Sequence, residues 1–232
     1  MENVPELAER GREVFDHFVE TLEKLKYRID WKIVRCEEYG VPQLRRRLVL
    51  LASKLGDLKV PEGKLSTPER WKTVRTTIGD LPPLKSGEEC PTDRLHVASL
   101  LSDLNLKRIK ATKWDGGNRR DWPEELVLEC HKKSTGDRYH SIYGRMWWDR
   151  PSPTMTTLCT GIGNGRFGHP KQNRSITLRE AALLQSFPRS YEFWPKEMKL
   201  NRGAVSRMIG NAVPPRLARA LGEAIMAHVS GL

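Results

Sequence analysis

The sequence is poor in cysteine, with four in 232 residues, and it has no long apolar run. The cysteines are widely spaced and form no CxxC pair, which argues against a disulfide framework and a standard zinc site, so we predict no bound metal. No stretch of about 20 apolar residues is present, and the N-terminus is acidic and polar, so we predict neither a membrane span nor a signal peptide. We therefore expect a cytoplasmic protein with reduced thiols.

Acidic side chains are scarce relative to basic ones. The sequence has 40 Lys and Arg against 29 Asp and Glu, a net charge of +11. Such an excess suggests a polyanionic partner, and nucleic acid is the first candidate. A basic, solvated surface explains the composition equally well, so charge alone leaves both interpretations open.

The first 56 residues alternate between helical and strand patterns. Apolar residues recur at three- and four-residue steps over residues 5–26, which predicts an amphipathic helix. Residues 31–36 have the pattern of a strand, and the apolar run 48–52 is typical of a strand buried on both faces. This order fits one edge of an α/β sheet.

From about residue 56 the pattern becomes irregular. Prolines interrupt the periodicity, and five of the seven tryptophans lie between Trp71 and Trp148. We expect one short helix here, over residues 102–111. Two clear helices close the chain: one begins at a capping box of Thr177 and Glu180, and the other follows Pro214-Pro215 with an apolar stripe.

Polar residues gather just before the apolar run 48–52. Gln43, Arg45 and Arg47 alternate there, so they share one face of the strand. Three hydrogen-bond donors on that face are costly to bury unless an anionic or carbonyl-rich group meets them. Without further context, a solvated basic turn is the simpler interpretation.

Four signatures along the chain together resemble the DNA cytosine-5 methyltransferase family. Glu2-Asn3-Val4 resembles motif VI, residues 39–47 (YGVPQLRRR) motif VIII, residues 175–193 motif IX and residues 210–215 (GNAVPP) motif X. The resemblance implies an α/β fold: the second half of a Rossmann-like methyltransferase sheet plus an irregular α+β target-recognition domain. On this basis residues 1–56 and the returning helices of 197–232 form the catalytic part, and residues 57–196 the recognition domain.

The resemblance also implies roles for individual residues. Family enzymes flip a cytosine out of the duplex and transfer a methyl group from S-adenosylmethionine to its C5 atom. Glu2 would hydrogen-bond the N3 atom and exocyclic amine of the cytosine, and Arg47, with Arg45 beside it, would reach the flipped base. Asn211 and Ala212 would border the S-adenosylmethionine pocket.

Residues expected to contact double-stranded DNA lie between motifs VIII and IX. The run 107–120 holds six basic residues and one acid, a net charge of +5, which suits phosphate contact, although a solvated loop is the alternative. The segment 150–157 and the glycines of 163–168 resemble the family's link to motif IX. Those glycines match GxGxxG, but Pro170 follows in place of a helix, so we reject a dinucleotide site and favour close approach to DNA. The predicted DNA-contact residues are Lys110, Lys113, Arg119, Arg120, Thr157 and Arg166.

Two family features have no counterpart in the sequence. No cysteine follows a proline, so the Pro-Cys nucleophile is absent, and the cofactor glycine motif is absent as well. We therefore expect the C-terminal portion or a subunit of a bacterial or archaeal modification methyltransferase, inactive until a second polypeptide supplies the missing half. A truncated gene product fits equally. The alternative from another class is a non-catalytic, sequence-specific DNA-binding module derived from a methyltransferase.

Overall fold

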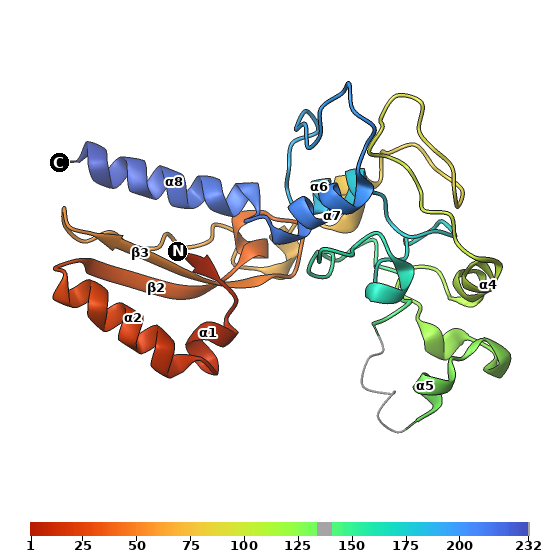
Figure 1. The fold of residues 1–232 in the computed structure, drawn as a ribbon, viewed down its shortest axis with the longest axis horizontal. Coiled ribbons are helices and arrows are strands. Elements are labelled where there is room, and N and C mark those ends of the chain that lie inside the picture. The colour runs from red at the N-terminus through yellow and green to blue at the C-terminus, as the bar shows by residue number, and fades with distance from the viewer. Residues whose placement is uncertain (134–140, 232) are drawn as a thin grey trace. The chain divides into compact units, whose positions relative to one another are not determined.

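The computed structural model describes residues 1–133 and 141–231 (Figure 1). The chain forms two compact units. Unit 1 comprises Met1–Trp71 and the chain from Val213 onward, and unit 2 comprises Lys72–Ala212. The sequence pattern places the corresponding boundaries earlier, after residues 56 and 196.

Unit 1 is built on a three-stranded antiparallel sheet with the order β1–β3–β2. β1 is Glu2–Asn3, β2 is Arg28–Arg35 and β3 is Arg46–Ser53. Successive side chains of the central strand, β3, point to opposite faces, and residues 48–51 are all buried. Both faces of the sheet are therefore covered, as the continuous apolar run predicts.

Helices supply the cover on each face of this sheet (Figure 1). α1 (Glu6–Glu9) and α2 (Arg12–Lys24) pack on one face, where Phe15 joins a cluster of β3 side chains. α8 (Pro215–Ser230) lies on the other face, where Leu217 packs with the remaining apolar residues of β3. Unit 1 is thus a three-layer arrangement, in agreement with the expected α/β fold class.

Two helical patterns differ in detail from the prediction. The single helix expected over residues 5–26 is two helices, because the chain turns at Gly11, whose φ of −93° and ψ of 27° are not helical. A Cβ atom at Gly11 would lie 3.0 Å from a backbone oxygen of the preceding turn, so the turn suits glycine. In α8 the predicted apolar stripe is buried at Leu217 but exposed at Ile225 and Val229, in the last turns of the helix.

Unit 2 consists of short helices joined by long irregular segments and isolated β-bridges. Its α-helices are α3 (Val74–Ile78), α4 (Asp103–Ala111), α5 (Glu129–Lys132), α6 (Leu178–Leu184) and α7 (Arg202–Asn211). Within the described part of unit 2, the 3-10 helices are η3 (Arg119–Asp121), η4 (Glu124–Leu126) and η6 (Ile162–Asn164). Among the residues that the structure describes, no helix is both long enough and apolar enough to cross a membrane.

A capping box begins α6, as the sequence predicts. The Thr177 hydroxyl accepts a hydrogen bond from the backbone N–H of Glu180, and the Glu180 carboxylate accepts one from the backbone N–H of Thr177 at 2.7 Å. The box satisfies backbone groups that the first turn leaves unpaired. Because every residue of α6 is buried, such satisfaction is required there.

Glu180 also anchors a buried ion pair. Each of its carboxylate oxygens accepts a hydrogen bond of 2.7 Å from the Arg174 guanidinium, and both side chains are buried. Burial alone would raise the pKa of Glu180, but the hydrogen bonds and charge of Arg174 outweigh it and lower the pKa to about 2. Burial lowers the pKa of the adjacent His169 to about 3, so this ring is neutral at physiological pH.

Candidate functional site

The register of β1 against β3 brings Glu2 to Arg47. Glu2 lies opposite Val49, and Arg47 is two residues from Val49 on the same face of β3. The Glu2 Oε1 atom is 2.8 Å from the Arg47 Nε atom, and the two side chains are only 22% and 14% exposed. Residues 45 positions apart in the sequence thus form an ion pair at one face of the sheet.

Arg45 belongs to the same cluster and is almost completely buried, with 4% exposure. Its backbone oxygen accepts a hydrogen bond of 2.8 Å from the Cys36 N–H, and its backbone N–H donates to the buried Glu37 carboxylate at 3.4 Å. Burial, followed by the charge of Arg47, lowers the pKa of Arg45 to about 10. We call Glu2, Arg45 and Arg47 the arginine–carboxylate cluster; it carries two positive charges and one negative charge.

The burial of these side chains excludes the solvated turn as a description of this segment. Gln43 is fully buried, Arg45 is buried, and Arg47 is largely covered. The turn before them contains Gly40, whose φ of 78° lies in the left-handed region that favours glycine. Arg216 of α8 donates to the Gly40 oxygen at 3.1 Å, so this turn is tied to the helix behind it.

A cysteine lies beside the cluster, but its burial disfavours the thiolate form. Cys36 is fully buried, and its burial raises the pKa of the thiol to about 12, although the charges of Arg45 and Arg47 act in the opposite direction. At neutral pH the sulfur therefore stays protonated, and a protonated, buried thiol is a poor nucleophile. Cys36, which is the sole cysteine in the sequence of unit 1, does not replace the absent Pro-Cys nucleophile.

The predicted cofactor residues Asn211 and Ala212 lie at the end of α7 in unit 2. The Asn211 side chain is exposed, and Ala212 is the C-cap. The fully buried Gln185 amide donates to the Ile209 oxygen at 3.0 Å and to the Ala212 oxygen at 2.9 Å. Gln185, at the end of α6, therefore fixes the turn that presents Asn211.

Thr157, a predicted DNA-contact residue, packs against the same helix. The backbone oxygen of Thr157 accepts a hydrogen bond of 2.7 Å from the Ser206 hydroxyl. The backbone of Thr157 also passes so close to Gly210 that a Cβ atom there would lie 2.4 Å from the Thr157 nitrogen. The segment before motif IX and the helix of motif X are therefore joined by backbone contact.

The basic segment of residues 107–120, which we call the basic loop, is partly surface and partly core. Four of its six basic residues are exposed: Lys107, Lys110, Lys113 and Arg120. Arg108 and Arg119 are buried, and Arg108 donates to the Leu126 oxygen and the Asn105 amide oxygen. Three of the four DNA-contact residues predicted in this loop are thus accessible, whereas the Arg119 side chain lies in the interior.

Arg166, also predicted to meet DNA, is buried inside unit 2. Its guanidinium donates to the oxygens of Gly116, Gly117 and Arg145, and its Cζ atom lies 4.1 Å from the centroid of the Trp147 ring. Gly116 serves the packing of this ring, because a Cβ atom there, where φ is +100°, would lie 1.8 Å from the Trp147 ring nitrogen. The glycine-rich stretch leads to a bridge at Gly168 rather than into a helix.

Arg145 organises this region, and sequence reasoning missed it. The side chain is fully buried without a carboxylate partner among its hydrogen bonds, and burial lowers the pKa to about 10. Five hydrogen bonds, 2.6–3.1 Å long, join it to the backbone oxygens of Ile109, Thr112, His169 and Gln172 and to the Asn173 amide oxygen. No local pattern signals this role, because the acceptors come from two distant segments.

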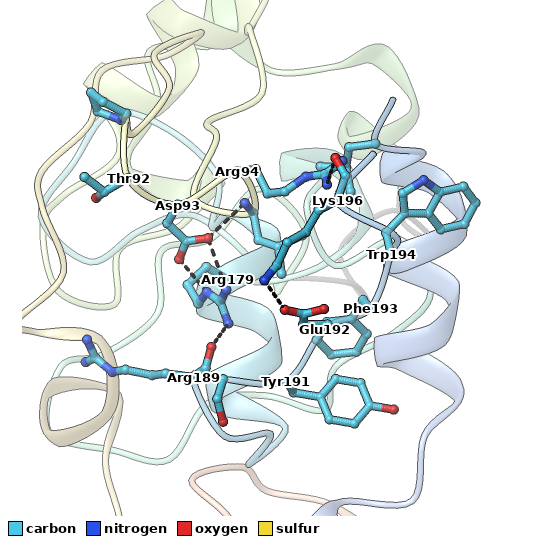
Figure 2. A pocket seen from close by; sticks show the side chains of 14 residues that line it. Thr92, Asp93, Arg94, Arg179, Arg189, Tyr191, Glu192, Phe193, Trp194 and Lys196 are labelled. Carbon is cyan, nitrogen blue, oxygen red and sulfur yellow. Dashed lines mark hydrogen bonds and ion pairs between the residues drawn. The ribbon is translucent and has the colours of Figure 1, made fainter. Parts of the chain in front are cut away.

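A separate hollow of about 600 Å³ lies between the segments 91–95 and 189–200 of unit 2 (Figure 2). Arg179 pairs with Asp93, Lys196 pairs with Glu192, and Arg94 donates to three backbone oxygens of residues 195–198. Figure 2 shows these side chains directed at one another across the hollow. Arg94 and Arg179 therefore link the two segments, whereas the pair of Lys196 and Glu192 lies within one of them, and we assign no chemistry to this hollow.

Comparison with known proteins identifies one family. The model of the C-5 cytosine-specific DNA methylase family matches residues 1–227. The type II methylase M.HgiDII of Herpetosiphon aurantiacus is 52% identical over 233 residues, which cover 100% of this chain and 65% of that protein. The type II methyltransferase M1.HphI of Haemophilus parahaemolyticus is 34% identical over 236 residues, covering 97% of this chain and 55% of that protein. The chain thus spans between half and two thirds of these relatives.

Solved structures agree on the fold. A candidate DNA modification methyltransferase encoded within an E. coli prophage superposes with a TM-score of 0.68 at 20% identity, over 99% of this chain and 68% of that one. The Entamoeba histolytica methyltransferase EhMeth superposes with a TM-score of 0.57 at 15% identity, over 98% of this chain and 62% of that one. At such low identity these likenesses describe the fold alone.

Proposed function

The chain belongs to the C-5 cytosine-specific DNA methylase family, and we propose that it supplies the base-holding and DNA-reading parts of an enzyme that methylates cytosine at C5 within a specific DNA sequence. The observation that carries this proposal is the register of β1 and β3, which sets the Glu2 carboxylate against Arg47 with Arg45 in electrostatic reach. A carboxyl group and two guanidinium groups on one face can hold a polar base by hydrogen bonds to its edge.

In this proposal the cluster binds the flipped cytosine. Glu2 hydrogen-bonds the N3 atom and the exocyclic amine, and Arg47 reaches the same base. Arg45 adds positive charge where attack on the ring pushes electrons onto it. Glu37 and Cys36 hold the Arg45 backbone in place. The ion pair between Glu2 and Arg47 keeps both side chains oriented before the base arrives.

S-adenosylmethionine, the methyl donor of this family, supplies the methyl group when it is bound. Asn211 and Ala212 are the residues that we propose border it. Their setting fits the role, because the exposed Asn211 side chain ends α7 and the buried Gln185 amide fixes the carbonyl that follows. These two residues would form one side of the pocket, since the family's glycine motif has no counterpart in these 232 residues.

In this proposal the attacking thiolate comes from protein outside these 232 residues. No cysteine follows a proline in the sequence, and burial keeps the Cys36 thiol protonated. We propose that further protein, on the same or a second polypeptide, brings the nucleophile and most of the cofactor pocket. We place the complete enzyme in the bacterial cytoplasm, where its DNA substrate lies.

A non-catalytic, sequence-specific DNA-binding module is the second candidate function. It is favoured by the exposed Lys110, Lys113 and Arg120, because phosphate contacts by such side chains require no active site. Both candidates bind DNA, so methyl transfer is the property that separates them.

A chimera tests the proposal directly. This chain would replace the matched 65% of M.HgiDII, so that the remaining part of that relative supplies what the chain lacks. We expect the chimera to incorporate tritiated methyl groups into mixed-sequence DNA and the 232-residue chain alone to give background counts. Arg47→Ala or Glu2→Ala in the chimera should slow methylation about 100-fold, the usual cost of one such hydrogen-bonding group.

Arg46→Ala is the matched control. Arg46 neighbours Arg47, but its side chain is 59% exposed and pairs with Glu9 of α1. We expect this variant to methylate at nearly the wild-type rate. Equal rates for the two variants would show that the cluster is not the base site. A chimera that binds DNA without methylating it would favour the binding module, and methylation by the chain alone would overturn the need for an external thiolate.

A further inference from the structure

An exposed tryptophan stands at the tip of the basic loop. Trp114 is 54% exposed, which makes it the most exposed of the seven tryptophans. The other tryptophan of this region, Trp122, is buried, and its ring nitrogen donates to the Thr112 hydroxyl at 2.7 Å. Trp114 has Lys113 as its chain neighbour, and the Lys113 side chain is 82% exposed. The tip therefore presents an aromatic surface next to an accessible positive charge.

The turn that carries Trp114 is held in one conformation. The next residue, Asp115, has a φ of 53°; its N–H donates to the Pro170 oxygen at 3.0 Å, and its carboxylate accepts from the Trp148 N–H at 2.6 Å. The Asp121 carboxylate closes the loop by accepting from the backbone N–H groups of Lys113 and Asn118. A loop fixed at both ends loses little entropy when it binds a ligand.

The Arg145 guanidinium lies beneath the indole. Its Cζ atom is 4.1 Å from the centroid of the Trp114 ring, within the range of cation–π contact. Arg145 is itself locked by hydrogen bonds to backbone and amide oxygens, so one face of the indole rests on a rigid support. Trp114 as a whole remains 54% exposed.

A flat, exposed aromatic face flanked by cations matches one feature of nucleic acid. Nucleobases stack on aromatic side chains, while neighbouring lysines meet the phosphates. In an intact duplex the faces of the bases already stack on one another, so only a base that has left the stack can offer a face. Family enzymes create such a base when they extrude a nucleotide.

We propose that Trp114, supported by Arg145, is a stacking residue for an unstacked nucleobase, and that Lys110 and Lys113 hold the phosphates beside it. The proposal rests on the proposed function for the DNA substrate, but it makes a separate claim: Trp114 distinguishes DNA containing an unstacked base from a perfect duplex. Lys110 and Lys113 act on both forms equally.

The test compares the binding of two DNAs by the full chain. One is a short duplex, and the other is the same duplex with a single unpaired adenine. We expect wild type to bind the bulged DNA more tightly, and Trp114→Ala to lose about 5- to 100-fold on bulged DNA with an unchanged duplex affinity. Trp114→Phe should retain most of the preference for bulged DNA. Because a stacked base quenches tryptophan fluorescence, this variant should also show less quenching than wild type when bulged DNA binds. Lys113→Ala should weaken the binding of both DNAs equally. Leu100→Ala, the control, truncates a residue that is 81% exposed and should change neither affinity.

Four results would overturn the inference. If wild type shows salt-sensitive duplex binding but no preference for the bulge, Trp114 does not stack, while the proposed DNA substrate stands. The same holds if Trp114→Ala keeps the preference with an unchanged melting temperature. If no DNA binds at all, the proposed function fails and this inference fails with it. The last result is a competition experiment. If polyglutamate displaces bulged DNA as readily as unlabelled DNA of the same total charge does, charge alone accounts for binding.

Discussion

The two units use arginine in opposite ways. In unit 1, Arg47 lies close enough to Arg45 that its charge contributes to lowering the pKa of Arg45, and the Glu2 carboxylate pairs with Arg47. In unit 2, Arg145 and Arg166 are each surrounded by backbone oxygens and each contact a tryptophan ring. The first pair concentrates charge at one face of a sheet, whereas the second pair cross-links irregular segments.

The difference follows from how each unit is built. In unit 1 the strands and helices satisfy most of their own backbone groups, and the arginine side chains bond single backbone oxygens, as Arg47 does at Arg46 and Arg216 at Gly40. Unit 2 has long segments without regular structure, and their backbone oxygens require donors from elsewhere. A guanidinium, with five N–H groups, can serve several such oxygens at once. Counting Lys and Arg in the sequence therefore gives too high a number of residues available to DNA, because some of the arginines hold unit 2 together.

The comparison is tested most severely by removing one arginine from each unit. Arg145→Met should destabilise the chain by about 3–5 kcal/mol, because buried oxygens lose their donor. Arg47→Ala should cost less, about 1–2 kcal/mol, because its ion pair is largely covered but retains some solvent contact. Calorimetric unfolding of the two variants measures both values. Equal losses would mean that Arg47 contributes as much to the stability of the fold as Arg145 does.

A pair of glycines sharpens the same contrast. A Cβ atom at Gly210, in α7 of unit 2, would lie 2.4 Å from the backbone at Thr156 and Thr157, whereas nothing lies within 4 Å of one at Gly222, in α8 of unit 1. Gly210→Ala should destabilise by about 2–3 kcal/mol through overpacking. Gly222→Ala should stabilise by about 0.5–1 kcal/mol, since alanine is the better helix former. Denaturant unfolding would contradict this picture if the two variants shifted the midpoint in the same direction.

The smallest effect concerns the exposed lysines of the basic loop. Four of its six basic residues are exposed. If all four contact phosphates, the logarithm of the binding constant should fall with the logarithm of the salt concentration with a slope of about −3.6. Contact by all six would give a slope of about −5. The Lys110→Ala/Lys113→Ala double variant should reduce the slope by about 1.8 without changing the melting temperature. Fluorescence anisotropy at several salt concentrations measures it. A slope identical to that of wild type would remove the loop from the DNA-contact surface.

Much of the architecture could be predicted because it depends on local pattern. The caps at Ser102 and Thr177 mark the starts of α4 and α6, and the apolar run of β3 indicates a strand covered on both faces. The break at Gly11 escaped prediction because the apolar spacing continues across it. The family resemblance selected Glu2 and Arg47, but periodicity alone favoured a solvated turn at Arg47.

The sequence by itself determined the family, the order of the principal helices and strands, and the absence of a Pro-Cys nucleophile from these 232 residues. The tertiary structure decided which charges face one another and which are buried. It placed Glu2 against Arg47 through strand register, and it buried Arg119, Arg145 and Arg166 in unit 2. The physical reason is range: capping and periodicity act over a few residues, whereas the burial of a long cationic side chain depends on acceptors that distant segments bring to it.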